Sequence, residues 1–444
     1  MNSAIFKAYD IRGTYPDQMD EHIAYRIGRA SVEHFSLRTV AVGRDIRDSS
    51  PAIFRELTRG LMEAGADVLD LGLVTTPMVY FAASRLEVDM AISVTASHNP
   101  PQYNGMKLAL KGALPVGLES GLSEIRDRAL SGIFETPERT GTMREQDIKP
   151  AYYSYFASFA DMGTKKFSVV IDTANAMGIL ELPIYDQFKE NISVINLYDD
   201  LTHPFECHEA NPLNLETLEE LQAKVIETGS HMGIAYDGDA DRIGFVDEKG
   251  ILIPMDLATA LLSEIILKKK PGSTILYDLR SSRAVREIIE ENGGHAKECK
   301  VGHANIKRQM RADGAVFAGE LSGHYYFEEN AFAEAGTLPA ILLLNLMAET
   351  GKPLSELVAK TRRYFHSGEI NSEVNDKDAI MATLREKYKD GKQHELDGLK
   401  VEYKDWWFNI RPSNTEPLLR LNLEAETEEL MRTKREELLA LIRA

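Results

Sequence analysis

Strands that are mostly apolar, and that alternate with helical stretches, constrain the fold of this chain most strongly. The segments RTVAVGRD (38–45), DVLDLG (67–72) and MAISVTA (90–96) are predicted strands, with helical patterns at 49–66 and 76–86 between them. A strand with one face in solvent alternates apolar and polar residues, which these segments do not do. The pattern therefore predicts a sheet that is covered by helices on both faces.

The same alternation restarts twice further along the chain. Strands are predicted at 167–175 and 232–240, and again at 273–280 and 315–322, with helical stretches between them. From about Gly368 the pattern changes to short strands and one final helix. The sequence thus predicts an α/β protein with three successive α/β domains and a smaller C-terminal α+β domain. The predicted domains span 1–148, 149–250, 251–364 and 365–444.

Composition limits the class of partner. The 444 residues carry 51 basic and 69 acidic side chains, and the net charge of −18 would repel nucleic acid and anionic membranes. The apolar stretches are too short to span a bilayer, and the first residues lack the core of a signal peptide. Two cysteines, Cys207 and Cys299, do not make a disulfide framework. We expect a cytoplasmic protein with no nucleic-acid or membrane partner.

Three aspartates alternate in the segment AYDGDADRIG (235–244). On an extended backbone Asp237, Asp239 and Asp241 would point to one side, and three oxygen donors around one point suit Mg²⁺ or Ca²⁺. An EF-hand loop is disfavoured because its sixth position, which needs glycine, is Arg242. The alternative is an acidic surface turn, but the flanking apolar strands would hold the carboxylates close enough to need a cation. We predict a divalent-metal site.

A polar segment, TASHNPPQYNGMK (95–107), directly follows an apolar strand. Two consecutive prolines restrict its backbone, and the carboxyl end of a strand is where open α/β sheets place their ligands. The elbow of a serine hydrolase is disfavoured, because Thr95 and Asn99 stand where its two glycines belong. A helix-capping serine is the alternative. The polar groups that favour a ligand site are Ser97, His98, Asn99, Asn104 and Lys107.

Two further loops combine polar groups near glycine or proline. In AGELSGHYYF (318–327), Glu320, Ser322 and His324 could bind sugar hydroxyls and move protons, with a simple hairpin turn as the alternative. In RPSNTEP (411–417), a guanidinium, two hydroxyls and an amide make a candidate phosphate cradle, with a surface turn as the alternative. The groups of this second loop are Arg411, Ser413, Asn414 and Thr415, and Arg420 could add a charge.

Together with KAYDIRG near the N-terminus, these four loops resemble, in the same order, the motifs of the α-D-phosphohexomutase family. The resemblance covers essentially the whole chain, and GELSGH is closest to the bacterial phosphomannomutase/phosphoglucomutase form. It implies three related α/β domains with mixed sheets covered by helices, and a fourth α+β domain, around a central cleft. The four domains would carry, in order, the phosphoserine, metal-binding, sugar-recognition and phosphate-binding loops.

The resemblance also implies roles for individual residues. Ser97 resembles the serine that is phosphorylated in the resting enzyme, and one of its phosphate oxygens would join the three aspartates in holding Mg²⁺. Arg12 and Lys107 would stabilise the phosphoryl group in transit. His324 is the expected general base, with Lys107 or His98 as alternatives. The other residues implied are Arg242 beside the metal and, for the sugar phosphate, Tyr9, Arg280, His303, Glu320, Ser322, Arg411, Ser413, Asn414, Thr415 and Arg420.

The implied activity is the interconversion of hexose 6-phosphate and hexose 1-phosphate, with mannose, glucose or both as the sugar. Phosphoserine would form a hexose 1,6-bisphosphate, which turns end for end, returns its other phosphoryl group and also serves as activator. Phosphoglucosamine mutase is the alternative within the family, although that group usually carries glutamine where Leu321 stands. Outside the family, the alternative is a non-catalytic protein that binds sugar phosphates or divalent ions. Both a monomer and a homodimer fit the sequence.

Overall fold

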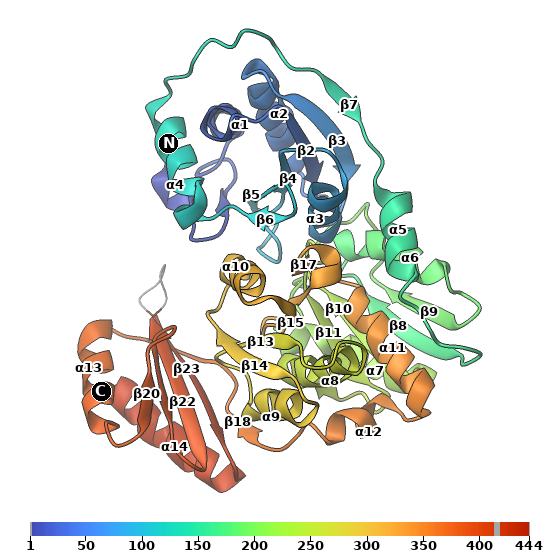
Figure 1. The fold of residues 1–444 in the computed structure, drawn as a ribbon, viewed down its shortest axis with the longest axis vertical. Coiled ribbons are helices and arrows are strands. Elements are labelled where there is room, and N and C mark those ends of the chain that lie inside the picture. The colour runs from blue at the N-terminus through green and yellow to red at the C-terminus, as the bar shows by residue number, and fades with distance from the viewer. Residues whose placement is uncertain (1, 413–417, 444) are drawn as a thin grey trace. The chain divides into compact units, whose positions relative to one another are not determined.

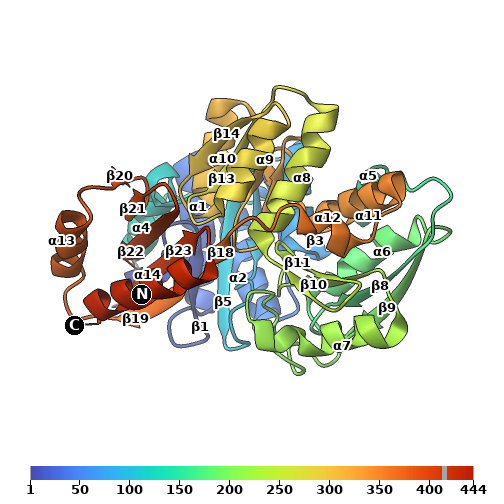
Figure 2. The same cartoon turned by 90° about the horizontal axis from the view of Figure 1, so that it is seen from below.

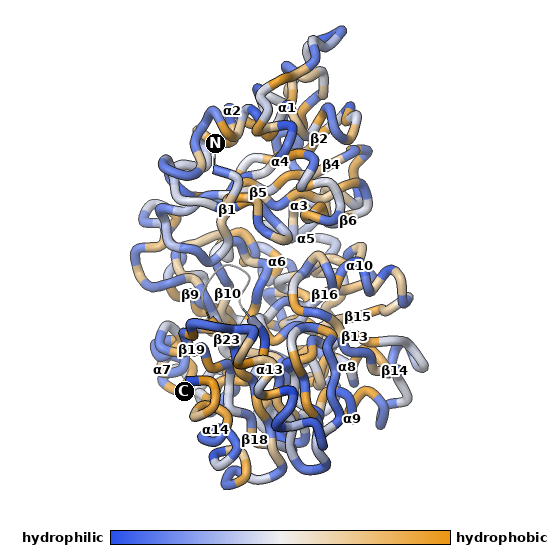
Figure 3. Tube along the Cα trace, turned by 90° about the vertical axis from the view of Figure 1, so that its left-hand side faces the viewer, coloured by the Kyte–Doolittle hydropathy of each residue, from blue (hydrophilic) through white to orange (hydrophobic). Residues whose placement is uncertain are grey.

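The computed structural model describes residues 2–412 and 418–443, and the chain divides into two compact units. Hydrophobic and hydrophilic stretches alternate along the trace (Figure 3). Among the described residues, no helix has both the length and the apolar character needed to cross a bilayer. Unit 1 comprises Met1–Met255, Gly302–Ala318 and Ser322–Glu356, and unit 2 comprises Asp256–Val301, Gly319–Leu321 and Leu357–Ala444.

The first sheet of unit 1 is mixed. Its strands β2 (Thr39–Arg44), β3 (Asp67–Leu73) and β4 (Met90–Val94) run parallel, as the uniformly apolar pattern indicates. Strand β5 (Tyr103–Leu110) runs antiparallel to β4 and brings the chain back along it, and β1 (Ile11–Thr14) pairs antiparallel with β5. The strand order is β1-β5-β4-β2-β3-β7. The two short strands are β6 (Leu114–Pro115) and β7 (Met143–Glu145).

Helices cover this sheet, which confirms the α/β prediction (Figure 1). Side chains of α1 (Glu21–Phe35) and α2 (Ser50–Glu63) share one apolar core with Val40 and Val42 of β2. Helix α3 (Thr76–Arg85) packs against β2 and β4 outside that core. Proline in the first turn favours the start of both α2 and α3. Helix α4 (Leu122–Ser131) precedes β7 in the chain, and α5 (Lys149–Ala157) follows it.

The second sheet of unit 1 has the order β12-β11-β10-β8-β9. Strand β10 is parallel to β8 and antiparallel to β11, so the chain reverses in the turn between β10 and β11. Helix α7 (Glu219–Thr228) packs against β8 and β10. The other elements are β8 (Phe167–Asp172), α6 (Leu182–Asp186), β9 (Ile192–Leu197), β10 (Met232–Tyr236), β11 (Ile243–Asp247) and β12 (Leu252–Ile253).

The third series of elements again alternates helix and strand. Strands β13 and β14 are parallel, as expected for strands joined through a helix, and β16 and β17 form an antiparallel pair. The elements are α8 (Met255–Lys269), β13 (Thr274–Asp278), α9 (Arg283–Glu291), β14 (His295–Cys299), α10 (His303–Asp313), β15 (Ala315–Gly319), β16 (Tyr325–Phe327), β17 (Ala333–Glu334), α11 (Leu338–Thr350) and α12 (Leu354–Ala359).

The C-terminal sheet of unit 2 differs because its strands alternate. Helix α14 lies alongside its strands (Figure 2). Apolar side chains of one face, such as Phe408 and Leu421, share a core with α13 and α14. The other face carries Lys400, Asn409, Arg411, Arg420 and Asn422. This α+β arrangement confirms the predicted change of character. The elements are β18 (Phe365–His366), β19 (Ile370–Glu373), α13 (Lys377–Lys387), β20 (Lys392–His394), β21 (Leu399–Glu402), β22 (Trp406–Pro412), β23 (Leu418–Ala425) and α14 (Glu428–Ile442).

Candidate active site

The three alternating aspartates lie in the tight turn between β10 and β11. Tyr236 and Ile243 are the last paired residues of the two strands, so the turn is only six residues long, from 237 to 242. Within it the Ala240 backbone adopts a left-handed φ of 61°. One oxygen from each carboxylate lies within 4.8 Å of the others. The carboxylates that the turn brings together, all buried, are Asp237, Asp239 and Asp241.

The electrostatics of this turn fit a divalent cation. Burial, together with the neighbouring Asp241 and Asp239, raises the pKa of Asp237 to about 7. Burial would also raise the pKa of Asp241, but Lys107 and His324 hold it well below its usual range. The buried oxygen Asp239 Oδ1 has no hydrogen-bond partner among the described residues. Carboxylate oxygens that crowd together with an unsatisfied member are the donor set that Mg²⁺ or Ca²⁺ accepts.

Ser97 follows the carboxyl end of β4 and contacts this turn. Its Oγ donates a hydrogen bond to Asp237 Oδ2 at 2.9 Å and lies 3.3 Å from His98 Nδ1. Ser97 has a φ of 54°, in the left-handed region that non-glycine residues rarely adopt. A Cβ on Gly238 would lie 2.2 Å from the Ser97 carbonyl oxygen, so the close approach of the two loops requires glycine at 238.

Lys107 reaches the same carboxylates from β5. Because β5 is antiparallel to β4, Lys107 pairs with Ser93, four residues before Ser97. Its Nζ donates to Asp239 Oδ2 at 2.7 Å and to Asp241 Oδ2 at 2.5 Å. Burial alone would lower the pKa of Lys107, but the two carboxylates raise it above its ordinary value. Lys107 is therefore protonated in this arrangement.

Two N-terminal residues of the predicted site lie in unit 1 as well. Arg12 of β1 donates to Asn99 Oδ1 in the loop that carries Ser97 (residues 95–103, the serine loop) and to Asp10 Oδ2, each at 2.5 Å. Tyr9 packs its ring edge against the ring of His303, with 5.8 Å between the centroids. A Cβ on Gly302 would lie 2.5 Å from the Tyr9 ring, so this contact also depends on glycine.

His324 lies against the metal loop. Its Nε2 is 3.1 Å from Asp241 Oδ1, and its Nδ1 is 2.7 Å from Ser322 Oγ. Arg242 Nε lies 3.4 Å from His324 Nε2 and 3.8 Å from Asp237 Oδ2. The structure thus brings Ser322, His324 and Arg242 to the same group of carboxylates.

The other two predicted histidines are uncharged. The positive charge of Arg242, followed by burial, lowers the pKa of His98 well below its usual range. For His303 burial is the main cause, and Lys307 adds to it. A lowered pKa keeps both imidazoles neutral and able to accept a hydrogen bond.

The remaining described members of the predicted site belong to unit 2. Arg280 donates to both carboxylate oxygens of Asp278, at 2.8 and 3.1 Å, and lies 3.6 Å from Glu320. Arg411 and Arg420 both contact Glu369, a residue that the sequence analysis did not identify. The predicted residues Ser413, Asn414 and Thr415 lie outside the described residues.

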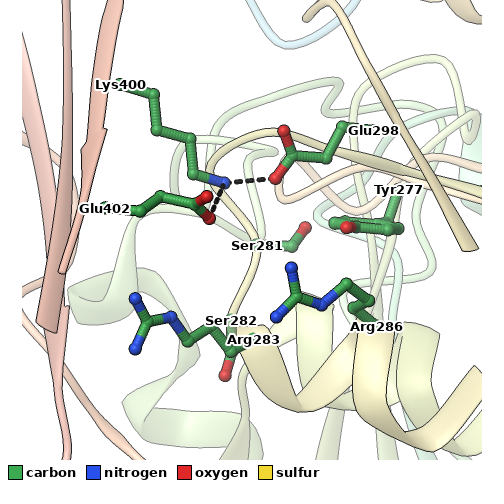
Figure 4. Close-up of a pocket in the computed structure, with 8 residues that line it drawn as sticks. All are labelled: Tyr277, Ser281, Ser282, Arg283, Arg286, Glu298, Lys400 and Glu402. Atoms are coloured by element: carbon green, nitrogen blue, oxygen red, sulfur yellow. Dashed lines mark hydrogen bonds and ion pairs between the residues drawn. The ribbon is translucent and has the colours of Figure 1, made fainter. Parts of the chain in front are cut away.

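A small polar pocket also lies in unit 2 (Figure 4). Lys400 forms ion pairs there with Glu298 and Glu402, so much of its charge is compensated. The lining residues are Tyr277, Ser281, Ser282, Arg283, Arg286, Glu298, Lys400 and Glu402.

Arg47 is a second residue that the sequence analysis missed. Its guanidinium is buried and donates to four carbonyl oxygens of the serine loop, and Asp45 accepts from its Nε at 3.1 Å. Its position in the sequence could have identified it. Arg47 follows strand β2, just as Ser97 follows the neighbouring parallel strand β4. The four carbonyls are those of Ser97 (2.7 Å), Asn99 (2.6 Å), Pro100 (2.7 Å) and Tyr103 (3.1 Å).

Comparison with known proteins agrees with this geometry. Four family profiles, described as the phosphoglucomutase/phosphomannomutase alpha/beta/alpha domains I, II and III and the C-terminal domain, match residues 3–135, 150–250, 255–364 and 369–441. The phosphomannomutase of Methanocaldococcus jannaschii is 40% identical over 450 residues, which cover 99% of this chain and 97% of that protein.

Two further proteins show the same likeness over the full length. A phosphomannomutase of Escherichia coli is 38% identical, over 99% of this chain and 99% of that protein. The crystal structure of a phosphoglucomutase/phosphomannomutase family protein of Burkholderia thailandensis superposes with a TM-score of 0.90 at 32% identity, covering 100% of this chain and 98% of that one. The chain therefore belongs to the α-D-phosphohexomutase family and is a phosphotransferase of the isomerase class.

Proposed function

We propose that this protein interconverts hexose 6-phosphate and hexose 1-phosphate, with mannose or glucose as the sugar, through a phosphorylated Ser97 and a hexose 1,6-bisphosphate. The observation that carries the proposal is the hydrogen bond from Ser97 Oγ to Asp237 Oδ2, with Lys107 bound to the adjacent carboxylates. A hydroxyl in this position has a cation and a candidate metal site within reach, which phosphoryl transfer requires.

Asp237, Asp239 and Asp241 would hold Mg²⁺, together with an oxygen of phosphorylated Ser97. The unsatisfied Asp239 Oδ1 and the crowding of the three carboxylates support this assignment. When bound, the cation would withdraw negative charge from the phosphoryl group.

The protein's own groups would stabilise and guide the transfer. A sugar hydroxyl attacks the phosphorus of phosphorylated Ser97, the bond to Ser97 Oγ breaks, and the proton of the hydroxyl passes to a base. His324 is the proposed base, and its contacts with Asp241 and Ser322 support this because they fix its ring. His98 and Lys107 are the alternatives. Protonated Lys107 and Arg12 would offset the charge on the moving group.

The sugar and its second phosphate would be bound by residues outside the serine and metal loops. We assign the sugar to Tyr9, His303, Glu320 and Ser322, and the non-reacting phosphate to the loop at 411–415. We further propose that the chain forms four domains, each of which supplies one of these loops. The four domains are 1–148, 149–250, 251–364 and 365–444. The residues assigned to the phosphate are Arg280, Arg411, Ser413, Asn414, Thr415 and Arg420.

A coupled assay tests this proposal. The purified protein is given mannose 1-phosphate, glucose 1-phosphate or glucosamine 1-phosphate, with Mg²⁺ and glucose 1,6-bisphosphate as activator. We expect turnover of mannose or glucose 1-phosphate to exceed that of glucosamine 1-phosphate at least tenfold. A preference for glucosamine 1-phosphate would instead identify a phosphoglucosamine mutase. Binding of all three sugars without turnover would identify a non-catalytic binding protein.

A further inference from the structure

Three arginines of unit 2 converge on one carboxylate. Glu369 lies directly before β19, in the short segment between β18 and β19 of the C-terminal sheet. Its carboxylate is partly buried and faces cations from three separate stretches of the chain. The donors are Arg411 Nη2 at 3.2 Å, Arg280 Nη1 at 3.3 Å, Arg420 Nη1 at 3.4 Å and Asn422 Nδ2 at 3.4 Å.

Sheet register explains why a carboxylate is needed here. Arg411 on β22 and Arg420 on β23 are directly opposite each other in an antiparallel pair. Like charges in that relation repel and destabilise a sheet. Asn371, two residues after Glu369, pairs with Arg420 from the other side of β23. Glu369 is thus placed to bridge the two arginines and to offset their repulsion.

The neighbouring charges have their own partners. Lys400, on the same polar face, forms ion pairs with Glu298 and Glu402 (Figure 4). Arg280 is already held by Asp278, and Glu320 lies 3.6 Å from it. Glu369 therefore compensates part of the charge of the Arg411–Arg420 pair in this structure.

Glu369 is ionised at neutral pH. Burial would raise its pKa, but Arg280, Arg411 and Arg420 lower the pKa to about 2. Among the described residues, the three arginines then face the carboxylates of Asp278, Glu320 and Glu369. A phosphate dianion that approaches this cluster meets positive charge that is already compensated.

We propose that Glu369 is an internal counter-ion, which occupies the arginine cluster and competes with the non-reacting phosphate of the substrate. The inference rests on the proposed function, which assigns that phosphate to Arg411 and Arg420. A carboxylate and a phosphate oxygen make the same charge-assisted hydrogen bonds to guanidinium groups, so one can replace the other.

Competition of this kind has a use in a reaction with a bisphosphate intermediate. The intermediate has to leave the arginines, turn and bind again before the second transfer. When phosphate leaves, Glu369 restores the contacts of the arginines, which lowers the free-energy cost of release. Glu369 thus weakens phosphate binding and speeds the dissociation of the phosphorylated sugar, and both effects are measurable.

Calorimetric titration with glucose 6-phosphate and with inorganic phosphate tests the inference. Glu369→Gln keeps the shape of the side chain and removes its charge. We expect this variant to bind both ligands about five- to tenfold more tightly, to release glucose 6-phosphate more slowly in stopped flow, and to show a lower KM without a higher kcat. In phosphate-free buffer its Tm should fall, because the arginine pair loses one counter-ion, and phosphate should raise the Tm more than in the wild type.

Glu373→Gln is the matched control, since it removes an exposed carboxylate from the same segment. Its affinity for phosphate should stay within twofold of the wild type. If Glu369→Gln does not fold, Glu369→Asp takes its place, because the shorter side chain reaches the arginines less well and should also tighten phosphate binding.

Arg411→Ala separates this inference from the proposed function. If Arg411→Ala leaves the affinity for glucose 6-phosphate unchanged, the assignment of the phosphate to this cluster is wrong. If Arg411→Ala weakens binding while the Glu369 variants bind no more tightly than the wild type, the role of Glu369 is overturned and the phosphate assignment stands.

Discussion

Arg47 Nη2 donates a hydrogen bond to the carbonyl oxygen of Ser97 at 2.7 Å. The same guanidinium binds three further carbonyls of the loop, so a single buried side chain fixes the segment that carries the proposed nucleophile. Because Ser97 holds a left-handed φ of 54°, its conformation depends on such external contacts.

Arg47→Lys should lower kcat at least tenfold and leave KM within twofold. One ammonium cannot reach four carbonyls, so Ser97 Oγ would move from its position beside Asp237, and a displacement of about 1 Å costs up to about 100-fold in rate. Steady-state kinetics with a phosphorylated hexose measures both constants. Arg59→Lys, on the exposed side of α2, is the control. A kcat within twofold of the wild type would show that Arg47 does not position Ser97.

Mg²⁺ affinity should depend on Asp239. Asp239→Asn removes one anionic oxygen from the three-carboxylate turn, and we expect at least tenfold weaker binding of Mg²⁺ to the dephosphorylated protein by calorimetry. A chelator should abolish turnover, and added Mg²⁺ should restore it. The exposed Asp127→Asn should bind Mg²⁺ as the wild type does. Equal affinity in Asp239→Asn would place the metal elsewhere.

The pair Lys307 and Glu334 should contribute strongly to the stability of unit 1. Their charged atoms lie 2.6 Å apart, both side chains are fully buried, and Lys307 Nζ lies 3.6 Å from the centre of the Tyr80 ring. Lys307→Met leaves Glu334 buried without its counter-ion and should lower the stability by about 3–5 kcal/mol. The double variant Lys307→Met/Glu334→Leu should regain part of that loss in urea denaturation. Full additivity of the two changes would contradict the pairing.

Glu181 should make stability fall as pH rises. Burial raises its pKa to about 7 from an ordinary value of 4.5, although hydroxyls of Thr337, Thr75 and Tyr152 bind it. Between these pH values the folded protein therefore holds a proton that the unfolded chain has released. Its contribution is complete below pH 4.5 and is lost, by about 3 kcal/mol in all, as pH rises to about 7.

Glu181→Gln should remove this pH dependence. The amide has no charge to bury, so the variant should match the wild type near pH 4 and exceed its Tm at pH 8. Thermal unfolding across this pH range measures the effect. An unchanged slope between pH 4.5 and 7 in the variant would assign the dependence to other groups.

Much of the fold could be predicted because uniformly apolar strands fit few architectures other than a sheet that is covered by helices on both faces. Strand β4 begins at Met90 as predicted, and the change to short strands and a final helix from about Gly368 indicated the α+β part. Helix α10 was not predicted. It is polar overall, and its buried positions include Lys307, whose place in a core becomes evident only with Glu334 opposite. A pattern based on apolar residues cannot detect such a helix.

The candidate site, too, could be predicted only in part. Its loops could be identified because prolines, glycines and alternating aspartates form recognisable local motifs in the sequence. The contact between Ser97 and Asp237 joins residues 140 positions apart and depends on how two sheets meet. No motif around Arg47 or Glu369 indicates a function. Arg47 matters because it binds carbonyl groups of another segment, and Glu369 because it binds arginines of other segments.

Phosphate on Ser97 is the most direct test of the proposed mechanism. The protein is incubated with glucose 1,6-bisphosphate and Mg²⁺, digested, and examined by mass spectrometry before and after a hexose monophosphate is added. We expect one phosphate on the peptide that contains Ser97, its loss when the monophosphate is added, and at least a thousandfold lower turnover in Ser97→Ala. Near-normal turnover by Ser97→Ala, or steady turnover while Ser97 stays unmodified, would contradict the phosphoserine mechanism.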